Sequence, residues 1–297
     1  MRVAILGCGY VGIELGRLLA LDHEVVGVRR SESGVGAIER AGFEAVRADV
    51  GDPGDLAGVP DADAVVFAAS SGGRGAAAAR EIYVEGLRTA IEAFAARSEP
   101  PDRLVYTSST GVYGDHGGDW VDEDTEIDPT TEKTRVLAEA ERVAVETTAD
   151  HGIDGTVARL SGLYGPDRYR LDRYLDGPVT EGYLNMVHRR DAAGAIGHLL
   201  TADLARDEVV LVTDDEPASK WEFADWLADQ CGVERPPKQT TAERLAADDL
   251  SAAAKRRIET SKRCSNRKLR ALGYEFAYPT FREGYREAIA AYRAARG

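Results

Sequence analysis

The chain has 297 residues, which suits one large domain or a main domain with a smaller companion. Its 51 acidic residues outnumber its 37 basic residues, and the resulting net charge of -14 argues against a broad surface for nucleic acid or for an anionic membrane. Few of the basic residues are lysines, which is typical of a salt-adapted cytoplasm or of an ordinary acidic protein from a GC-rich genome.

The cysteines and the apolar runs exclude further classes of protein. Cys8, Cys231 and Cys264 show neither metal-ligand spacing nor a paired framework, so we expect reduced thiols and no metal site. No apolar run approaches the roughly 18 residues of a membrane span. The chain enters a strand at once, without a signal peptide. These features predict a cytoplasmic protein.

The first expected elements are a short apolar strand at residues 3–6, a glycine-rich turn and a helix that begins near residue 10. The turn has G-x-G-x-x-G spacing. In a dinucleotide site the first glycine permits the bend, the second lets the backbone approach the pyrophosphate, and the third lets the helix pack on the strand. The free N–H groups of the helix then attract phosphate. We therefore predict cofactor binding by Gly7, Gly9, Tyr10, Val11 and Gly12. The alternative is a glycine-rich turn in an unrelated α/β domain.

Strands and helices then alternate along the chain. Further strands are predicted at residues 24–28, 43–48, 64–69, 104–108 and 156–160. Helices are predicted at about 76–97 and 131–149, with a glycine-rich turn at 70–75 and a loop at 111–129. This order predicts an α/β fold with a Rossmann-like, doubly wound parallel sheet over residues 1–165.

The pattern loosens after residue 165. Residues 166–186 contain turns and tyrosines, helices are predicted at 190–203 and 220–231, and residues 240–270 are predicted to be helical and highly charged. A strand at 209–212 is expected to return to the main sheet. We expect residues 166–297 to form a smaller substrate-binding cap, interleaved with the main domain.

The end of the second strand bears on the choice of cofactor. An acidic side chain there binds the ribose 2′-hydroxyl of NAD, whereas an arginine accommodates the 2′-phosphate of NADP. Arg29 and Arg30 occupy this position, and no acidic residue follows before Glu32. Guanidinium groups match phosphate oxygens, so we predict NADP, with NAD as the alternative. A solvated basic pair in a loop is the simpler interpretation.

Several later stretches share one resemblance. They cover residues 48–50, 107–114, 159–166, 185–191 and 265–274. With the opening glycines, they resemble the extended short-chain dehydrogenase/reductase superfamily of the NAD-dependent epimerase/dehydratase type over nearly the whole chain. The resemblance implies that Asp49 and Val50 flank the adenine and that Ser109 takes the position of a catalytic Ser or Thr. It also implies a cofactor-lining role for Ala68, Ala69 and Ser70.

The chain departs from this superfamily in the catalytic pair. Members usually carry Tyr-x-x-x-Lys on the helix after the serine loop, where the tyrosine is the general acid/base and the lysine lowers its pKa and holds the nicotinamide ribose. Alignment on Pro129 and residues 138–139 puts Thr131 and Arg135 at the two positions. Threonine is too weak an acid for this proton transfer, whereas arginine could still hold a ribose.

Three other features differ from the usual pattern. Tyr83 stands where a structural asparagine is usual, and Gly162 stands where nucleotide-sugar epimerases commonly place a phosphate-contacting asparagine. The glycine turn is one residue shorter than in most extended members. Together these departures resemble the atypical branch, which keeps the fold and the dinucleotide site but lacks the standard tetrad.

Further candidates come from aromatic and imidazole side chains. Tyr113 and Tyr164 each follow a strand end and precede a glycine, so either could reach the cleft, although buried tyrosines more often only pack. His188 titrates near neutral pH and borders the expected substrate side, or simply begins a helix. Ser109 could also cap a turn. The candidate catalytic set is Ser109, Tyr113, Thr131 and Arg135, and the candidate substrate set is Tyr164 and His188.

Three functions remain open at this point. The first is an NADP-dependent oxidoreductase or epimerase that acts on a small polar or sugar-like molecule, with Ser109 orienting the reacting oxygen. The second is a protein that senses NADP or another ligand without turnover. The third is an NAD-dependent sugar-nucleotide epimerase with relocated catalytic residues. Members of the superfamily often form homodimers through helices that correspond to 76–97 and 131–149.

Overall fold

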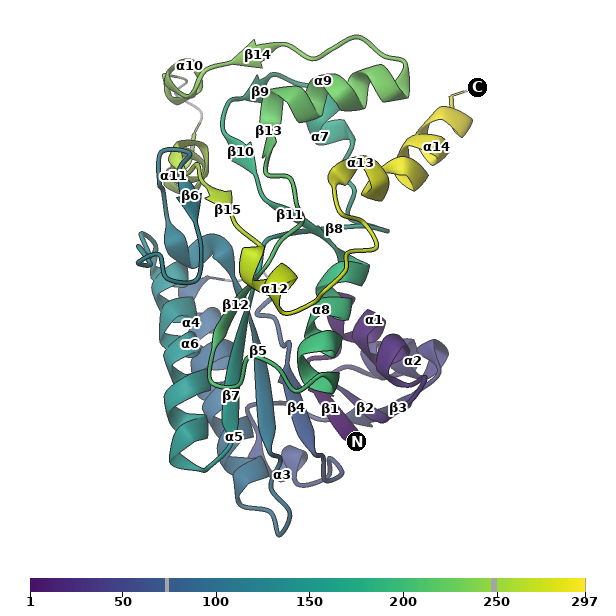
Figure 1. Cartoon of the computed structure of the whole chain (residues 1–297), viewed down its shortest axis with the longest axis vertical. Helices are drawn as coiled ribbons and strands as arrows, with labels where there is room; N and C mark the ends of the chain where they lie inside the picture. The colour runs from purple at the N-terminus through teal and green to yellow at the C-terminus, as the bar shows by residue number, and fades with distance from the viewer. Residues whose placement is uncertain (73–74, 247–249, 297) are drawn as a thin grey trace.

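A seven-stranded parallel sheet forms the centre of the computed structural model, which describes residues 1–72, 75–246 and 250–296 (Figure 1). The strand order is β12-β7-β5-β4-β1-β2-β3. The strands are β1 (Arg2–Leu6), β2 (Glu24–Arg29), β3 (Glu44–Arg47), β4 (Ala64–Phe67), β5 (Arg103–Ser109), β7 (Asp154–Leu160) and β12 (Val209–Val212). Because β1 lies between β2 and β4, its carboxyl end is the switch point at which open α/β sheets bind ligands.

Helices cover both faces of this sheet (Figure 1). One face carries α3 (Pro53–Leu56), α4 (Ala76–Arg80), α5 (Leu87–Ala95) and α6 (Glu132–Asp150), and the other carries α1 (Tyr10–Leu19), α2 (Glu32–Ala41) and α8 (Arg189–Thr201). The central strands β1 and β4 are mostly apolar, as expected where helices cover both faces of a parallel sheet. In β1, for example, Ala4 and Leu6 enter one core while Val3 and Ile5 enter the other. The predicted doubly wound fold is confirmed.

The helix expected at residues 76–97 is not uniform. Between α4 and α5, the π-helical segment η1 (Glu81–Gly86) adds a wider turn. Its inner side is buried at Val84 and Gly86, and a Cβ atom on Gly86 would lie 3.3 Å from Val50 Cγ2. Wide turns of this kind often occur at functional sites.

A smaller unit lies beyond the carboxyl ends of the strands (Figure 1). Its core is formed by Phe223 and Leu227 of α9 (Lys220–Cys231), Phe281 of α13 (Phe281–Gly284) and Ile289 of α14 (Arg286–Ala294). Shorter elements complete it: β8 (Gly162–Tyr164), α7 (Asp172–Leu175), β9 (Val179–Thr180), β10 (Tyr183–Leu184), β11 (Met186–His188), β13 (Ala218–Ser219) and β14 (Lys238–Gln239). The chain leaves this unit for α8 and β12 and then returns to it, so the two units are interleaved.

The region at 240–270 differs from the continuous helix that the sequence suggests. It divides into α10 (Thr241–Leu245), α11 (Ala252–Glu259), β15 (Arg263–Cys264) and α12 (Arg267–Ala271). Strand β15 pairs with β6 (Trp120–Val121), which lies inside the expected loop at 111–129, after the 3-10 turn η2 (Thr110–Tyr113). The extended pair forms because it buries Cys264 and Val121 in one apolar cluster. Residues 247–249 of this region, and 73–74 of the expected glycine-rich turn, lie outside the described residues.

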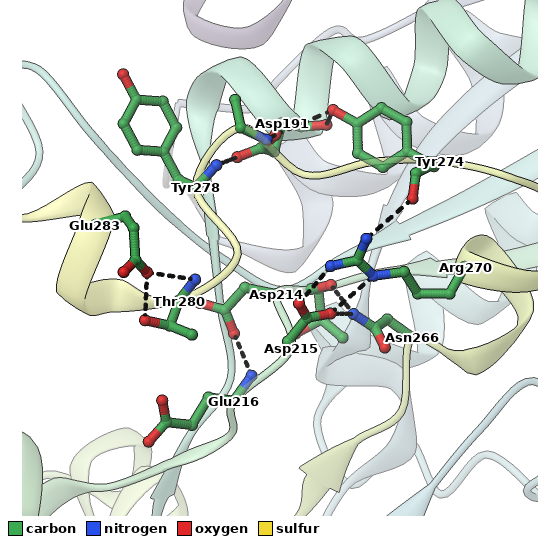
Figure 2. A network of polar contacts seen from close by, with 12 residues as sticks. Asp191, Asp214, Asp215, Glu216, Asn266, Arg270, Tyr274, Tyr278, Thr280 and Glu283 are labelled. Carbon is green, nitrogen blue, oxygen red and sulfur yellow. Dashed lines mark hydrogen bonds and ion pairs between the residues drawn. The ribbon is translucent and has the colours of Figure 1, made fainter.

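Polar contacts fasten the C-terminal segment to the main domain (Figure 2). Asp191, in the first turn of α8, accepts hydrogen bonds from the Tyr274 hydroxyl at 3.1 Å and from the backbone N–H groups of Ala277 at 2.7 Å and Tyr278 at 2.9 Å. After β12, Asp215 accepts a hydrogen bond from Arg270 Nε at 3.0 Å. The aspartate at the end of the 185–191 stretch therefore has a structural role.

Candidate functional site

A cavity of about 660 Å³ lies at the carboxyl ends of β1, β2, β4, β5 and β7, across the switch point. Its position follows from the topology, because parallel strands bring the residues after their carboxyl ends to one edge of the sheet. Most of the predicted cofactor residues line it: Gly7, Gly9, Tyr10, Val11, Arg29, Arg30, Asp49, Val50, Ala68, Ala69 and Ser70.

The glycine turn forms one wall of this cavity. Gly7 has a φ of 76°, and a Cβ atom there would lie 2.2 Å from Ala69 Cα, which is backbone and cannot move aside. A Cβ on Gly9 would lie 2.6 Å from Arg29 Nη1. Gly12 faces away from the cavity, where a Cβ would lie 3.0 Å from Ile5 Cγ2, so this glycine sets the close packing of α1 on β1. Gly7 and Gly9 therefore lie at the cavity, whereas Gly12, which the sequence analysis also lists as a cofactor-binding residue, does not line it and instead packs α1 on β1.

The start of α1 is open to a ligand. Its N-cap residue is Gly9, and no side chain in residues 1–72, 75–246 or 250–296 caps the first N–H groups of the helix. The turn itself is fixed to β2, because the N–H groups of Gly7 and Cys8 donate to Val28 O at 3.1 and 3.0 Å. A rigid turn with unpaired N–H groups at a helix start fits a pyrophosphate.

Tyr10 connects the glycine turn with the start of the cap. Its hydroxyl donates to Pro166 O at 2.9 Å, and the Arg168 guanidinium lies 4.0 Å from its ring centroid. Arg168 lines the cavity as well and makes no ion pair within the described residues. The sequence reasoning did not single it out, because only the fold brings it beside the turn.

Two arginines differ in their surroundings at the end of β2. Arg30 is exposed, and its Nη1 atom lies 3.3 Å from Asp49 Oδ2, so a carboxylate partly neutralises it. Arg29 is half-buried above Gly9, and its guanidinium group makes no hydrogen bond or ion pair within the described part of the chain. Arg29 is therefore, like Arg168 beside the glycine turn, a cation that remains available for an anionic ligand at this end.

Polar side chains gather at the other end of the cavity. They come from the loop after β4, from η1, from the end of β5, from the start of α6 and from the loop after β7. These residues are Ser70, Ser71, Tyr83, Ser109, Lys133 and Ser161. Of this set, the sequence reasoning placed only Ser109 and Ser70 in the site.

Ser109 and Ser161 differ in the hydrogen bonding of their hydroxyl groups. Ser109 Oγ accepts a hydrogen bond from the N–H of Gly111 at 3.2 Å, so it caps η2 while lining the cavity. Ser161 is 7% exposed, and its Oγ atom has no hydrogen-bond partner among the residues that the structure describes. Because a buried hydroxyl without a partner is costly, Ser161 is well placed to bond to a molecule in the cavity.

The Tyr83 hydroxyl has a distinctive environment. It accepts hydrogen bonds from the backbone N–H of Ser71 at 3.3 Å and from Ser71 Oγ at 3.2 Å. Burial alone would raise the pKa of this phenol, but the bonds from Ser71 and Ser70 and the charge of Lys133 bring its pKa below the usual value. In the sequence, the only sign that Tyr83 could belong to the site was that it replaces the usual asparagine at this position.

The orientation of α6 corrects the proposed alignment of the catalytic pair. Lys133 and Leu137 line the cavity, whereas Thr131 and Arg135 are absent from its lining. Thr131 is the N-cap residue, and its Oγ1 accepts the N–H of Thr134 at 3.0 Å. Residues two positions apart on a helix point about 200° apart. The pair at 131 and 135 therefore cannot face the cavity that the pair at 133 and 137 faces. The alignment is therefore shifted by two residues.

A buried ion pair fixes this rotation of α6. Glu141 lies one turn beyond Leu137 and two turns beyond Lys133. Its carboxylate accepts hydrogen bonds from Arg159 Nε of β7 at 3.0 Å and from Ser108 Oγ of β5 at 2.5 Å. The spacing of residues 133, 137 and 141 was therefore the signal that could have given the correct alignment.

Tyr113 is buried outside the cavity. Its hydroxyl donates to Asp122 O at 2.6 Å and accepts from Arg159 Nη1 at 2.7 Å, and burial raises the pKa of the phenol. Tyr164 is also outside, where it stacks on Tyr285 with ring centroids 5.0 Å apart. Burial raises its pKa too. Both tyrosines have packing roles here.

His188 acts as the N-cap of α8. Its Nδ1 atom accepts the N–H of Arg190 at 3.3 Å, and its ring lies 3.9 Å from the ring centroid of Tyr278. Burial and the charges of Arg189 and Arg190 lower its pKa to about 4, so the imidazole is neutral at neutral pH. It does not line the cavity.

The described residues contain neither a metal-binding cluster nor a membrane-spanning helix. No group of three or more His, Cys, Asp or Glu side chains in these ranges could hold a metal ion. Within residues 1–72, 75–246 and 250–296, no helix combines the length and the apolar character that crossing a bilayer requires. Cys8, Cys231 and Cys264 are free and buried.

Comparisons with known proteins agree with this geometry. The model of the NAD dependent epimerase/dehydratase family matches residues 3–199. Protein YeeZ of Escherichia coli (strain K12) is 31% identical over 290 residues, which are 94% of this chain and 96% of that protein. A conserved protein of unknown function from Silicibacter pomeroyi DSS superposes with a TM-score of 0.76 at 26% identity, over 98% of each chain. The dTDP-glucose 4,6-dehydratase DesIV from Streptomyces venezuelae, solved with NAD and TYD bound, shares the fold with a TM-score of 0.79 at 20% identity, over 100% of this chain and 98% of that one.

Proposed function

Because the chain belongs to the NAD dependent epimerase/dehydratase family, we propose that it is an NADP-dependent oxidoreductase acting on a carbonyl or alcohol group of a small polar or sugar-like molecule. One observation carries this proposal. A single cavity joins a glycine turn and an unpaired Arg29 at one end to hydroxyl groups and an ammonium group at the other. The first end suits a dinucleotide, and the second suits the polarisation of a substrate oxygen.

The residues of the first end fit the cofactor. Gly7 and Gly9 let the backbone approach a pyrophosphate, and the open start of α1 offers N–H groups to it. Arg29 would bind the 2′-phosphate that distinguishes NADP from NAD. Asp49 would then hold Arg30 rather than a ribose hydroxyl. When bound, the cofactor supplies or accepts a hydride.

The residues of the second end suit a small substrate with oxygen atoms. Ser109 and Ser161 offer hydroxyl groups, and Lys133 offers a positive charge. We place the reaction in the cytoplasm, where NADP is available and where the three buried, free cysteines remain reduced.

A second candidate is a protein that binds NADP without turnover. The observation that favours it is the content of α6, where Lys133 and Leu137 take the two cavity-facing positions in place of a tyrosine and a lysine. A sensor would need only the first end of the cavity.

Titration with the two cofactors tests the proposal. We expect NADPH to bind at least about tenfold more tightly than NADH, because one charge-assisted contact contributes about 1.5–3 kcal/mol. Binding is measured by the fluorescence of the nicotinamide ring. Arg29→Ala should remove this preference. Arg30→Ala is the matched control and should have a smaller effect, because Asp49 already pairs with Arg30. Equal or tighter binding of NADH would overturn the assignment of NADP.

Turnover separates the enzyme from the sensor. A panel of aldehydes, ketones and keto sugars is followed by the loss of NADPH absorbance. Oxidation of NADPH by any member supports the oxidoreductase. Tight binding of NADPH without turnover across the panel would favour the sensor, and no binding of either cofactor would overturn both candidates.

A further inference from the structure

We propose that Tyr83 is the proton donor and acceptor of this site and that Lys133 is its cationic partner. This inference rests on the proposed oxidoreductase function. The tyrosine and the lysine come from two different helices, η1 and α6, rather than from adjacent turns of one. Both side chains line the end of the cavity that also holds Ser109.

The hydrogen bonds of Tyr83 leave its own proton available. Ser71 donates twice to the phenol oxygen, from its backbone N–H at 3.3 Å and from its Oγ at 3.2 Å. The Ser70 side chain bonds to the phenol as well, so the groups among the described residues that could accept the Tyr83 proton are serine hydroxyls, and an oxygen of a molecule in the cavity can take their place. Two donated hydrogen bonds also stabilise the phenolate, which is the form that must exist after the proton has left.

The backbone holds this side chain in place from both sides. Ser71 is 4% exposed and follows β4, so its two donors are part of the buried sheet edge. On the other side, η1 packs closely through Gly86 against Val50. A proton donor needs fixed geometry to be effective, and Tyr83 has it.

Lys133 supplies the charge that such a phenol requires. It is half-buried in the first turn of α6, and it makes no ion pair or hydrogen bond within the described residues. The hydrogen bonds from Ser71 and Ser70 have the larger effects on the pKa of Tyr83, and the ammonium group of Lys133 adds to them through space by favouring the phenolate. The buried pair between Glu141 and Arg159 fixes the rotation of α6 and therefore the direction in which Lys133 points.

The proposed step balances as follows. Reduction of a carbonyl requires one hydride at carbon and one proton at oxygen. The hydride comes from the bound cofactor, which is oxidised in the step. The O–H bond of Tyr83 breaks, and its proton forms the O–H bond of the product alcohol. A proton from water then restores the phenol. In the oxidation direction, the phenolate takes the alcohol proton. Lys133 stays protonated throughout, and Ser109 Oγ can donate to the same substrate oxygen.

Titration of the tyrosines in the free protein tests the pair without cofactor or turnover. The chain has 12 tyrosines, and ¹³Cζ labelling gives one NMR signal for each. The signal missing in Tyr83→Phe identifies the residue. We expect Tyr83 to titrate below the ordinary value of about 10, to move upward in Lys133→Met and to stay near the wild-type position in Lys133→Arg. Tyr113→Phe is the control, because Tyr113 lies outside the cavity. Titration of Tyr83 at or above the ordinary value would overturn the inference whatever the activity.

Kinetics provide the second arm. Tyr83→Phe should lower kcat about 100-fold or more and change the pH profile, while the Kd for NADPH changes less than about threefold. A variant that binds NADPH and keeps its kcat would overturn the role of Tyr83 and leave the oxidoreductase function standing. If the wild type binds NADPH but turns over no carbonyl, the oxidoreductase function fails instead. The titration still decides whether Tyr83 and Lys133 form a pair. Circular dichroism of the Tyr83 and Lys133 variants verifies that they fold.

Discussion

The two ends of the cavity are built by different means. At the cofactor end, the main features are backbone features of one contiguous stretch: the turn from Gly7 to Gly9 and the open start of α1. At the reaction end, side chains converge from five separate segments. A site made of backbone does not tolerate a change in chain conformation. A site made of converging side chains can move a function from one element to another, as the inferred pair of Tyr83 and Lys133 illustrates.

The largest effect is expected at the cofactor end, for Gly7→Ala. The φ of 76° is unfavourable for alanine, and its Cβ atom would meet Ala69 Cα at 2.2 Å. Relief requires a shift of β1 against β4, so we expect a loss of about 3 kcal/mol or more in the free energy of unfolding. Binding of NADPH should fall below detection. Urea denaturation and fluorescence titration measure the two effects.

Gly42→Ala is the matched control for this substitution. Gly42 also has a positive φ, 96°, but a Cβ atom there would meet nothing within 4 Å. We expect only the backbone strain, about 1–2 kcal/mol, and unchanged affinity for NADPH. If the two variants behaved alike, conformational strain alone would explain the glycine turn, and the close approach to Ala69 would have no role.

The same difference explains how much could be predicted from the sequence. The strand, the glycine spacing and Arg29 lie within one local pattern, and the structure places them where that pattern predicts. Tyr83 and Lys133 belong to no local pattern. Their proximity depends on the rotation of α6, which the distant Arg159 sets through Glu141. Alignment on Pro129 therefore gave positions two residues away.

Three candidates failed to reach the cavity for a related reason. Tyr113, Tyr164 and His188 each stand in a stretch that resembles the family, and each is buried beside a packing partner instead. Sequence position shows that a residue follows a strand end. It does not show whether the side chain turns toward the ligand or toward the interior.

An intermediate effect is expected for His188, which is buried outside the cavity. Its pKa is lowered to about 4 in the folded protein, so protonation favours the unfolded state. The stability that depends on the neutral imidazole is complete above the unfolded pKa of about 6.5 and is lost as the pH falls toward 4. His188→Asn removes this dependence. The stability of the wild type relative to the variant should therefore drop by about 2 kcal/mol between pH 7 and pH 5.

Urea denaturation at the two pH values measures this difference. His151→Asn, at an exposed position, controls for the change of residue type. A relative stability of His188→Asn that stays constant between pH 7 and pH 5 would contradict the buried, neutral imidazole. It would return His188 to the group of residues that meet solvent or substrate.

The smallest effect is expected for Ser161→Ala, and its sign is informative. The Ser161 hydroxyl is buried without a partner in the described part of the chain, so its removal should leave the free protein equally stable or more stable by up to about 1 kcal/mol. Affinity for NADPH or for substrate should fall by about fivefold, because the ligand loses a hydrogen bond. Ser108→Ala is the matched control on the neighbouring strand. Ser108 Oγ donates to the buried Glu141, so this variant should lose about 1–2 kcal/mol of stability. A loss of stability in both variants would mean that Ser161 bonds within the protein and that the reaction end has one ligand contact fewer.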